Sequence, residues 1–189
     1  MSKFTNKIDF AVLFTVEKAN PNGDPLDGNR PRVDVDGYGE MSDVCIKRKI
    51  RNRLQDMGEK VFVQSQERSD DGCNSLSARV DANKELAKHK KDKSSDEFAK
   101  IACESWIDVR SFGQVFAFKG STLSVGVRGP VTVRTAVSVS PVDVSTMQIT
   151  KSVNSEEKAG KAPDTMGSKN RVEFGLYKLC GSINHQLAE

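Results

Sequence analysis

The 189-residue chain has little of what metal sites, disulfide frameworks and membrane spans require. Its cysteines, Cys45, Cys73, Cys103 and Cys180, are scattered without a Cys-x-x-Cys pair and have only two histidines to join them, so we expect no structural zinc. No apolar run approaches the roughly 18 residues of a membrane-spanning helix, and the first residues lead us to expect no signal peptide. We therefore expect no metal, no cofactor, no membrane partner, and a cytoplasmic location with free thiols.

Motifs of nucleotide chemistry are also lacking. Neither G-x-x-x-x-G-K-[ST] nor G-x-G-x-x-G occurs, which leaves nucleotide hydrolysis without support. Four acidic residues, Asp24, Asp27, Asp34 and Asp36, suggest a metal-dependent nuclease as an alternative. However, Asp and Asn beside Gly and Pro are common in turns, and Gly37 comes too early for an EF-hand. We expect no catalytic residue.

Positive charge is modest overall but clustered. Lys and Arg exceed Asp and Glu by only three, 29 against 26, whereas residues 44–55 hold five cations and no acid. Ser42 suits an N-cap, and apolar residues at helical spacing followed by Gly58 predict a helix over residues 43–57. The apolar residues are Ile46, Ile50, Leu54 and Met57.

One flank of this predicted helix carries Lys47, Arg48 and Arg51. Cations clustered in this way indicate a polyanionic partner, with nucleic acid to be tested first. A merely solvated face, or a face that meets an acidic protein, remains an alternative. The long Asn, Gly and Pro-rich connection over residues 20–40 offers Asn20, Asn22 and turn N–H groups to sugar and phosphate oxygens.

The remaining pattern predicts an α+β fold with an antiparallel sheet, best described as ferredoxin-like or RRM-like with insertions. We expect a central strand buried on both faces over residues 8–16, a short strand over 61–63, and a second amphipathic helix from about Ser95. Strand composition returns over residues 109–118, 125–139 and 172–179. The polar segments 64–95 and 140–170 read as an insertion and a protruding arm. Met147 and Met166 of this arm can wedge between unstacked bases or contact a neighbouring protein.

Several motifs together resemble one known family, the Cas-seven (Csd-two type) backbone subunit of type I-C CRISPR Cascade. They occur in family order along the whole chain: Ala19-Asn20-Pro21-Asn22-Gly23-Asp24-Pro25, Gly28-Asn29-Arg30-Pro31-Arg32, the segment 42–52, Asp108-Val109-Arg110-Ser111-Phe112-Gly113, Val127-Arg128-Gly129-Pro130-Val131 and Thr165-Met166-Gly167.

The resemblance implies a non-catalytic protein that polymerises with other copies of itself along a CRISPR RNA, beside other Cascade subunits, and presents the guide to target DNA. It implies one RRM-like domain over 1–189 with a finger at 64–95 and a thumb at 140–170. A metal-dependent CRISPR RNA endonuclease of the same superfamily is the alternative. Family members continue past the position of Glu189, so the family's C-terminal part is expected to be missing. The RNA-binding residues expected are Asn20, Asn22, Gly23, Asp24, Asn29, Arg30, Lys47, Arg48, Arg51, Arg128, Met147 and Met166.

Overall fold

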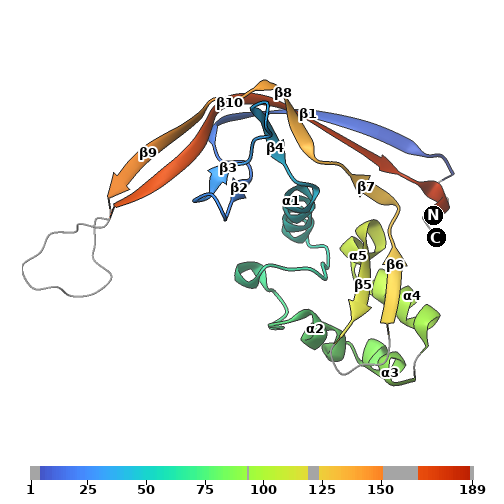
Figure 1. Cartoon of the computed structure of the whole chain (residues 1–189). Coiled ribbons are helices and arrows are strands. Elements are labelled where there is room, and N and C mark those ends of the chain that lie inside the picture. The colour runs from blue at the N-terminus through green and yellow to red at the C-terminus, as the bar shows by residue number, and fades with distance from the viewer. Residues whose placement is uncertain (1–4, 93, 119–123, 151–165, 188–189) are drawn as a thin grey trace, which may run out of the picture. The chain divides into compact units, whose positions relative to one another are not determined.

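The computed structural model describes residues 5–92, 94–118, 124–150 and 166–187 (Figure 1). The chain divides into two compact units. The first, the helical unit, comprises residues 1–10, 46–133 and 181–189. The second, the sheet unit, comprises residues 11–45 and 134–180. Helices combined with antiparallel strands confirm the predicted α+β class.

The main sheet has the strand order β1-β10-β8-β4. These strands are β1 (Ile8–Ala19), β4 (Tyr38–Met41), β8 (Ala136–Pro141) and β10 (Met166–Ile183). With 18 residues, β10 is long enough to pair antiparallel with β7 (Val131–Val133), β8 and β9 (Val144–Thr150) at successive positions. The pairing of β9 with the first part of β10 forms a two-stranded arm in the sheet unit. Residues 151–165 of the predicted thumb lie outside the described part of the chain.

Strand β1 does not have the central, two-faced burial that its apolar composition predicts. It stands at the end of the described strand order with β10 as its neighbour, and Val16 is its one buried residue. Phe14 stacks on Tyr177 of β10 with the ring centroids 5.6 Å apart, whereas Leu13 is 63% exposed. Alternation of apolar residues therefore correctly predicted a strand but not its neighbours, because period-two patterning carries no information about edge position.

The helical unit contains most of α1 (Asp43–Asp56), followed by the short η1 (Gln66–Arg68), α2 (Leu76–Ala82) and α3 (Lys84–Asp92). Helices α4 (Ser95–Ser105) and α5 (Ile107–Phe112) precede a hairpin of β5 (Gly113–Ala117) and β6 (Ser124–Arg128), and η2 (His185–Leu187) comes last. The predicted helices over 43–57 and from Ser95 are confirmed. Gly58 has φ +84°, which is the left-handed conformation expected after a helix end.

Aromatic residues form the core of the helical unit. Phe62 packs against Trp106 and Phe116, with ring centroids 4.6 and 5.2 Å away. Val80 and Leu86, from the segment predicted as an insertion, are fully buried in the same core. Other members of this cluster are Phe98, Ala102, Val109 and Val125.

Two strand predictions in the helical unit are wrong. Residues 61–63 have no strand partner, because the N–H groups of Phe62 and Val63 donate to the carboxylate of Asp108 instead. Residues 109–112 belong to α5, and only from Gly113 does the chain become a strand. Gly113 has φ +78°, so the change from helix to strand takes place at a residue that adopts this conformation without strain.

Candidate nucleic-acid interface

The loop that follows β1 is tied to the start of α1 in the sheet unit. The Asn22 side-chain oxygen accepts hydrogen bonds from the Ser42 N–H at 2.9 Å and from the Ser42 hydroxyl at 3.1 Å. The Ser42 hydroxyl oxygen in turn accepts from the Cys45 N–H at 3.2 Å, which is the N-cap interaction predicted for this helix. The Cys45 thiol donates to the Pro21 carbonyl at 3.6 Å. Asn22 therefore orients the Ser42 side chain that caps α1.

The other polar loop residues predicted to bind RNA also stabilise the loop itself. Asn20 donates its amide to the Asn29 carbonyl at 2.6 Å. Asn29 has φ +59°, a conformation that Asn tolerates better than most residues. Gly23, in β2 (Gly23–Asp24), lies so close to Asn29 that a Cβ on Gly23 would stand 1.9 Å from the Asn29 side-chain oxygen. The Asp24 carboxylate accepts from the Leu26 N–H at 3.0 Å and pairs with Arg32 at 3.2 Å.

The loop contacts the base of the two-stranded arm. Arg30, in β3 (Arg30–Pro31), donates to the Thr146 hydroxyl at 3.3 Å, and the Asn170 amide donates to the Gly28 carbonyl at 3.2 Å. Thr146 and Asn170 are paired across β9 and β10 and share a hydrogen bond of 2.8 Å. Loop and arm therefore form one polar surface, although the residues joined lie 116 and 142 positions apart in sequence.

The two methionines of the arm lie on opposite faces of it. Side chains alternate between the faces of a strand, and directly paired residues share a face. Met166 is four residues before Asn170 on β10 and is therefore on the face that contacts the loop, whereas Met147 follows Thr146 and is on the other face. Met166 is 66% exposed and accepts a hydrogen bond at its sulfur from Gln148 at 2.9 Å.

Arg48 and Arg51 have protein partners within the helical unit. Arg51 Nε donates to the Asp108 carboxylate at 2.8 Å, with side-chain exposures of 12% and 0%. Arg48 donates from its guanidinium to the Val63 carbonyl at 2.8 Å. Burial, followed by the nearby positive charge of Arg51, lowers the pKa of Arg48 from its ordinary value. These contacts fix both side chains along the predicted flank of α1.

Phe112, the last residue of α5, lies beside the same flank. The Lys47 ammonium is 6.0 Å from the centroid of its ring, and the Arg51 guanidinium carbon is 5.2 Å away. Arg128, another residue predicted to bind RNA, is exposed at the end of β6 and pairs with Gly113, the residue after Phe112. The structure thus assembles the predicted cations of α1 around one acid and one aromatic ring.

Sequence reasoning gave no role to Asp108 or Phe112. Both belong to the motif Asp108-Val109-Arg110-Ser111-Phe112-Gly113. The sequence does hold one signal for Asp108, which stands between the apolar residues Ile107 and Val109. An acid in such a setting is usually paired with a cation or a hydrogen-bond donor when it is buried.

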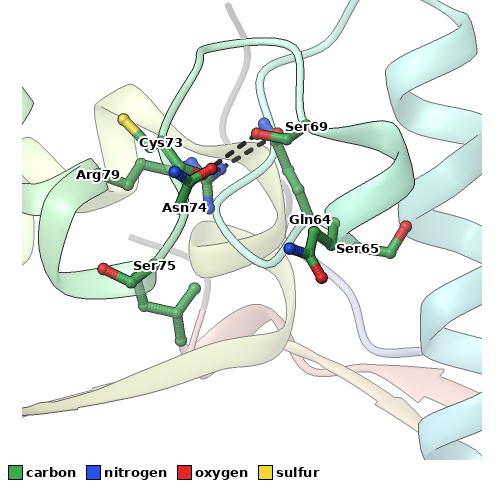
Figure 2. Close-up of a pocket in the computed structure, with 9 residues that line it drawn as sticks. Gln64, Ser65, Ser69, Cys73, Asn74, Ser75 and Arg79 are labelled. Atoms are coloured by element: carbon green, nitrogen blue, oxygen red, sulfur yellow. Dashed lines mark hydrogen bonds between the residues drawn. The ribbon is translucent and has the colours of Figure 1, made fainter.

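The helical unit also contains a pocket of about 280 Å³, lined mainly by residues with polar side chains (Figure 2). Arg79, which is buried, lies at its wall and donates to the carbonyls of Phe62 at 2.9 Å and Cys73 at 3.2 Å, and it pairs with Asp71. The hydrogen bond from Arg79 lowers the pKa of Asp71 to about 2. Other lining residues are Gln64, Ser65, Gln66, Ser69, Asn74, Ser75 and Leu76.

Metal-binding clusters and membrane-spanning helices are both absent from the described part of the chain. Among the described residues, no three His, Cys, Asp or Glu side chains come together in a way that could hold a metal ion. None of the helices in the described ranges has the length and apolar character needed to cross a bilayer.

The fold is that of subunits found in CRISPR surveillance complexes. One chain of a solved "CRISPR RNA-guided surveillance complex, pre-nicking" aligns with a TM-score of 0.56 and 17% identity, covering 95% of this chain and 61% of that chain. A chain of another "CRISPR RNA-guided surveillance complex" aligns with a TM-score of 0.51 and 18% identity, covering 95% and 50%.

Residues 6–189 match the model of the family described as CRISPR-associated protein Cas7, and the chain belongs to that family. A CRISPR-associated protein Cas7 of Haloferax volcanii is 25% identical over 201 residues, which cover 97% of this chain and 58% of the relative. The chain therefore spans less than two thirds of the relative's length. Membership confirms the resemblance at the level of the Cas7 family.

Proposed function

We propose that the chain is a non-catalytic backbone subunit of a type I-C Cascade that binds CRISPR RNA through its sugar-phosphate strand. The observation that carries this proposal is the cation flank of α1, whose side chains are held by protein contacts. Lys47 lies over the ring of Phe112, Arg48 donates to the Val63 carbonyl, and Arg51 donates to the Asp108 carboxylate. Contacts to phosphate position a strand without reading its sequence, which is what a protein that must hold any guide requires.

On this proposal, N–H groups of each guanidinium beyond those in the bonds described above bind phosphate. Arginine has five N–H donors in a planar fork, and the bond to Asp108 uses only Nε of Arg51. Anchoring reduces the side-chain entropy that is lost when RNA binds. In the sheet unit, the surface formed by the loop and the arm offers hydroxyl and amide groups from Thr146 and Asn170, which suit ribose hydroxyls.

We assign the base wedge to Met166 and a protein contact to Met147. Met166 shares its face of the arm with the loop that is predicted to hold RNA, whereas Met147 is on the opposite face and 39% exposed. On this proposal Met147 meets another copy of the subunit in a filament, beside other Cascade subunits, and the guide between wedges pairs with target DNA.

RNA binding tests the proposal. Mixed-sequence single-stranded RNA is titrated with the full chain by fluorescence anisotropy from 50 to 300 mM NaCl. Lys47→Ala should weaken binding and flatten the slope of log K against log salt by about 0.7, the value of one phosphate contact on a single strand. Lys49→Ala is the matched control, because Lys49 is exposed on the other flank of α1. A slope unchanged by Lys47→Ala, or lowered equally by both variants, contradicts the proposal.

The wedge and the nuclease alternative have their own measurements. RNA containing 2-aminopurine brightens when a base is unstacked, so Met166→Ala should reduce the brightening while Met147→Ala leaves it unchanged. Equal effects contradict the assignment. Labelled repeat RNA incubated with Mg²⁺ should stay intact, and cleavage that is lost in Asp24→Ala would establish the endonuclease instead.

A further inference from the structure

Two cations on α1 share one aromatic ring. Lys47 and Arg51 are four residues apart and therefore neighbours on the helix surface, where like charges destabilise each other. The Asp108 carboxylate compensates the charge of Arg51, and the face of the Phe112 ring, which carries negative charge density, attracts cations within about 6 Å. The distances from the ring centroid are 6.0 Å for the Lys47 ammonium and 5.2 Å for the Arg51 guanidinium carbon.

The backbone that carries this ring is closely packed. A Cβ on Gly113, the next residue, would lie 2.4 Å from the Val127 carbonyl oxygen, and a Cβ on Gly129 would lie 2.2 Å from the Ser111 carbonyl oxygen. The end of α5 and the chain after β6 thus approach each other at a distance that only glycine permits. Phe112 is held at a defined position, and Asp108, one turn earlier on α5, fixes Arg51 from its Nε.

We propose that Phe112 is a positioning residue for phosphate binding: its ring holds Lys47 beside Arg51, so that both can contact one sugar-phosphate strand. This inference rests on the proposed function and adds to it a reason why the Lys47 and Arg51 side chains lie side by side. Phe112 itself touches no ligand. It acts by attracting both cations to one ring and by restricting the Lys47 side chain before RNA arrives.

The experiment changes the ring without changing its shape. In the full chain, 3,4,5-trifluorophenylalanine at position 112 withdraws electron density from the ring face and keeps the packing. A second variant, Phe112→Leu, removes the ring. Both should weaken binding of mixed-sequence single-stranded RNA about two- to fivefold at 100 mM NaCl, the range of one exposed cation–ring contact. Phe174→Leu is the control, because Phe174 is a half-exposed aromatic residue of β10.

The Lys47→Ala background separates positioning from a structural role. If the ring acts through Lys47, trifluorophenylalanine should have little effect in a Lys47→Ala background, whereas a general loss of structure would weaken both backgrounds equally. A fluorinated chain that binds RNA as the parent does overturns the inference, whether or not Phe112→Leu folds.

The inference and the proposed function fail in different ways. If Lys47→Ala weakens binding and the fluorinated ring does not, the phosphate interface stands and Phe112 has no part in it. If neither change affects binding, the proposed function itself is wrong.

Discussion

Arg51 of α1 donates its Nε–H to the Asp108 carboxylate of α5 at 2.8 Å, and Asp108 is completely buried. The same carboxylate accepts the N–H groups of Phe62 at 2.7 Å and Val63 at 3.1 Å. One acid therefore connects two helices and the segment between α1 and η1. A residue expected to bind RNA also holds the fold together, so binding and stability must be measured separately for Arg51 variants.

Asp108→Asn should strongly destabilise the helical unit. The amide cannot accept three N–H donors as the carboxylate does, and Arg51 keeps an uncompensated charge, so we expect a loss of about 3 kcal/mol in the free energy of unfolding. Urea unfolding followed by circular dichroism measures this. Asp9→Asn is the control, because its exposed pair with Lys7 contributes about 0.5 kcal/mol or less. Similar losses in both variants would contradict the role given to Asp108.

Local patterns predicted α1, whereas the residues that its arginines contact could not be predicted. The Ser42 cap, the apolar spacing and Gly58 all lie within or beside the helix, and such signals act over a few residues. The partner of Arg51 lies 57 positions away, and no pattern within the helix indicates it.

The wrong strand prediction over residues 61–63 has the same cause, a contact with a distant residue. Val61, Phe62 and Val63 have strand composition, but the Asp108 carboxylate accepts the N–H groups of Phe62 and Val63 where a neighbouring strand was expected. β-propensity describes residues that fit a half-buried pleated surface, not which groups satisfy the backbone. The contacts of Arg30 with Thr146 and of Asn170 with Gly28 were beyond prediction, because they depend on the path of β10.

Asn22→Ala should weaken the start of α1. The substitution leaves the Ser42 N–H without its acceptor and frees the Ser42 hydroxyl from the orientation in which it caps Cys45. We expect a loss of about 1 kcal/mol in the free energy of unfolding, the usual value of a cap. Ser42→Ala should cost about the same, and the double variant should cost less than the sum, since both act on one network. Additive losses would show that Asn22 does not act through Ser42.

Tyr177→Phe should leave the stability unchanged or raise it. The Tyr177 hydroxyl is fully buried and finds no hydrogen-bond partner among the described residues, and burial raises its pKa. Removing an unpaired polar group avoids a desolvation penalty of about 1 kcal/mol.

The position of the Tyr177 hydroxyl explains why β4 needs a glycine at its second residue. A Cβ on Gly39 would stand 2.2 Å from that hydroxyl, so Gly39→Ala should destabilise the chain by about 2 kcal/mol through overpacking. Tyr177→Phe should restore part of the loss, because it removes the atom nearest to the new methyl group. A double-mutant cycle by urea unfolding measures the coupling, and an absence of rescue would show that the ring carbons or Val142 decide the clash.

Asp71 should make the stability of the helical unit depend on pH in acid. Its pKa in the folded chain is about 2, below the ordinary 3.8, mainly because Arg79 donates a hydrogen bond to the carboxylate. Since the unfolded chain binds the proton more readily, the contribution of Asp71 is complete above about pH 5 and disappears as the pH falls through 3.8 towards 2. Because the carboxylate is one-third exposed, we expect only about 1–2 kcal/mol from this pair at pH 7.

Asp71→Asn should therefore lower the melting temperature at pH 7 by a few degrees, and the difference from the parent chain should shrink steadily below pH 4. Asp70→Asn is the neighbouring control and should follow the parent more closely, because the Asp70 carboxylate accepts from Gln64 and Gln55 amides. A melting difference for Asp71→Asn that stays constant from pH 7 to pH 2.5 would mean that the charge of this carboxylate does not stabilise the wall of the pocket.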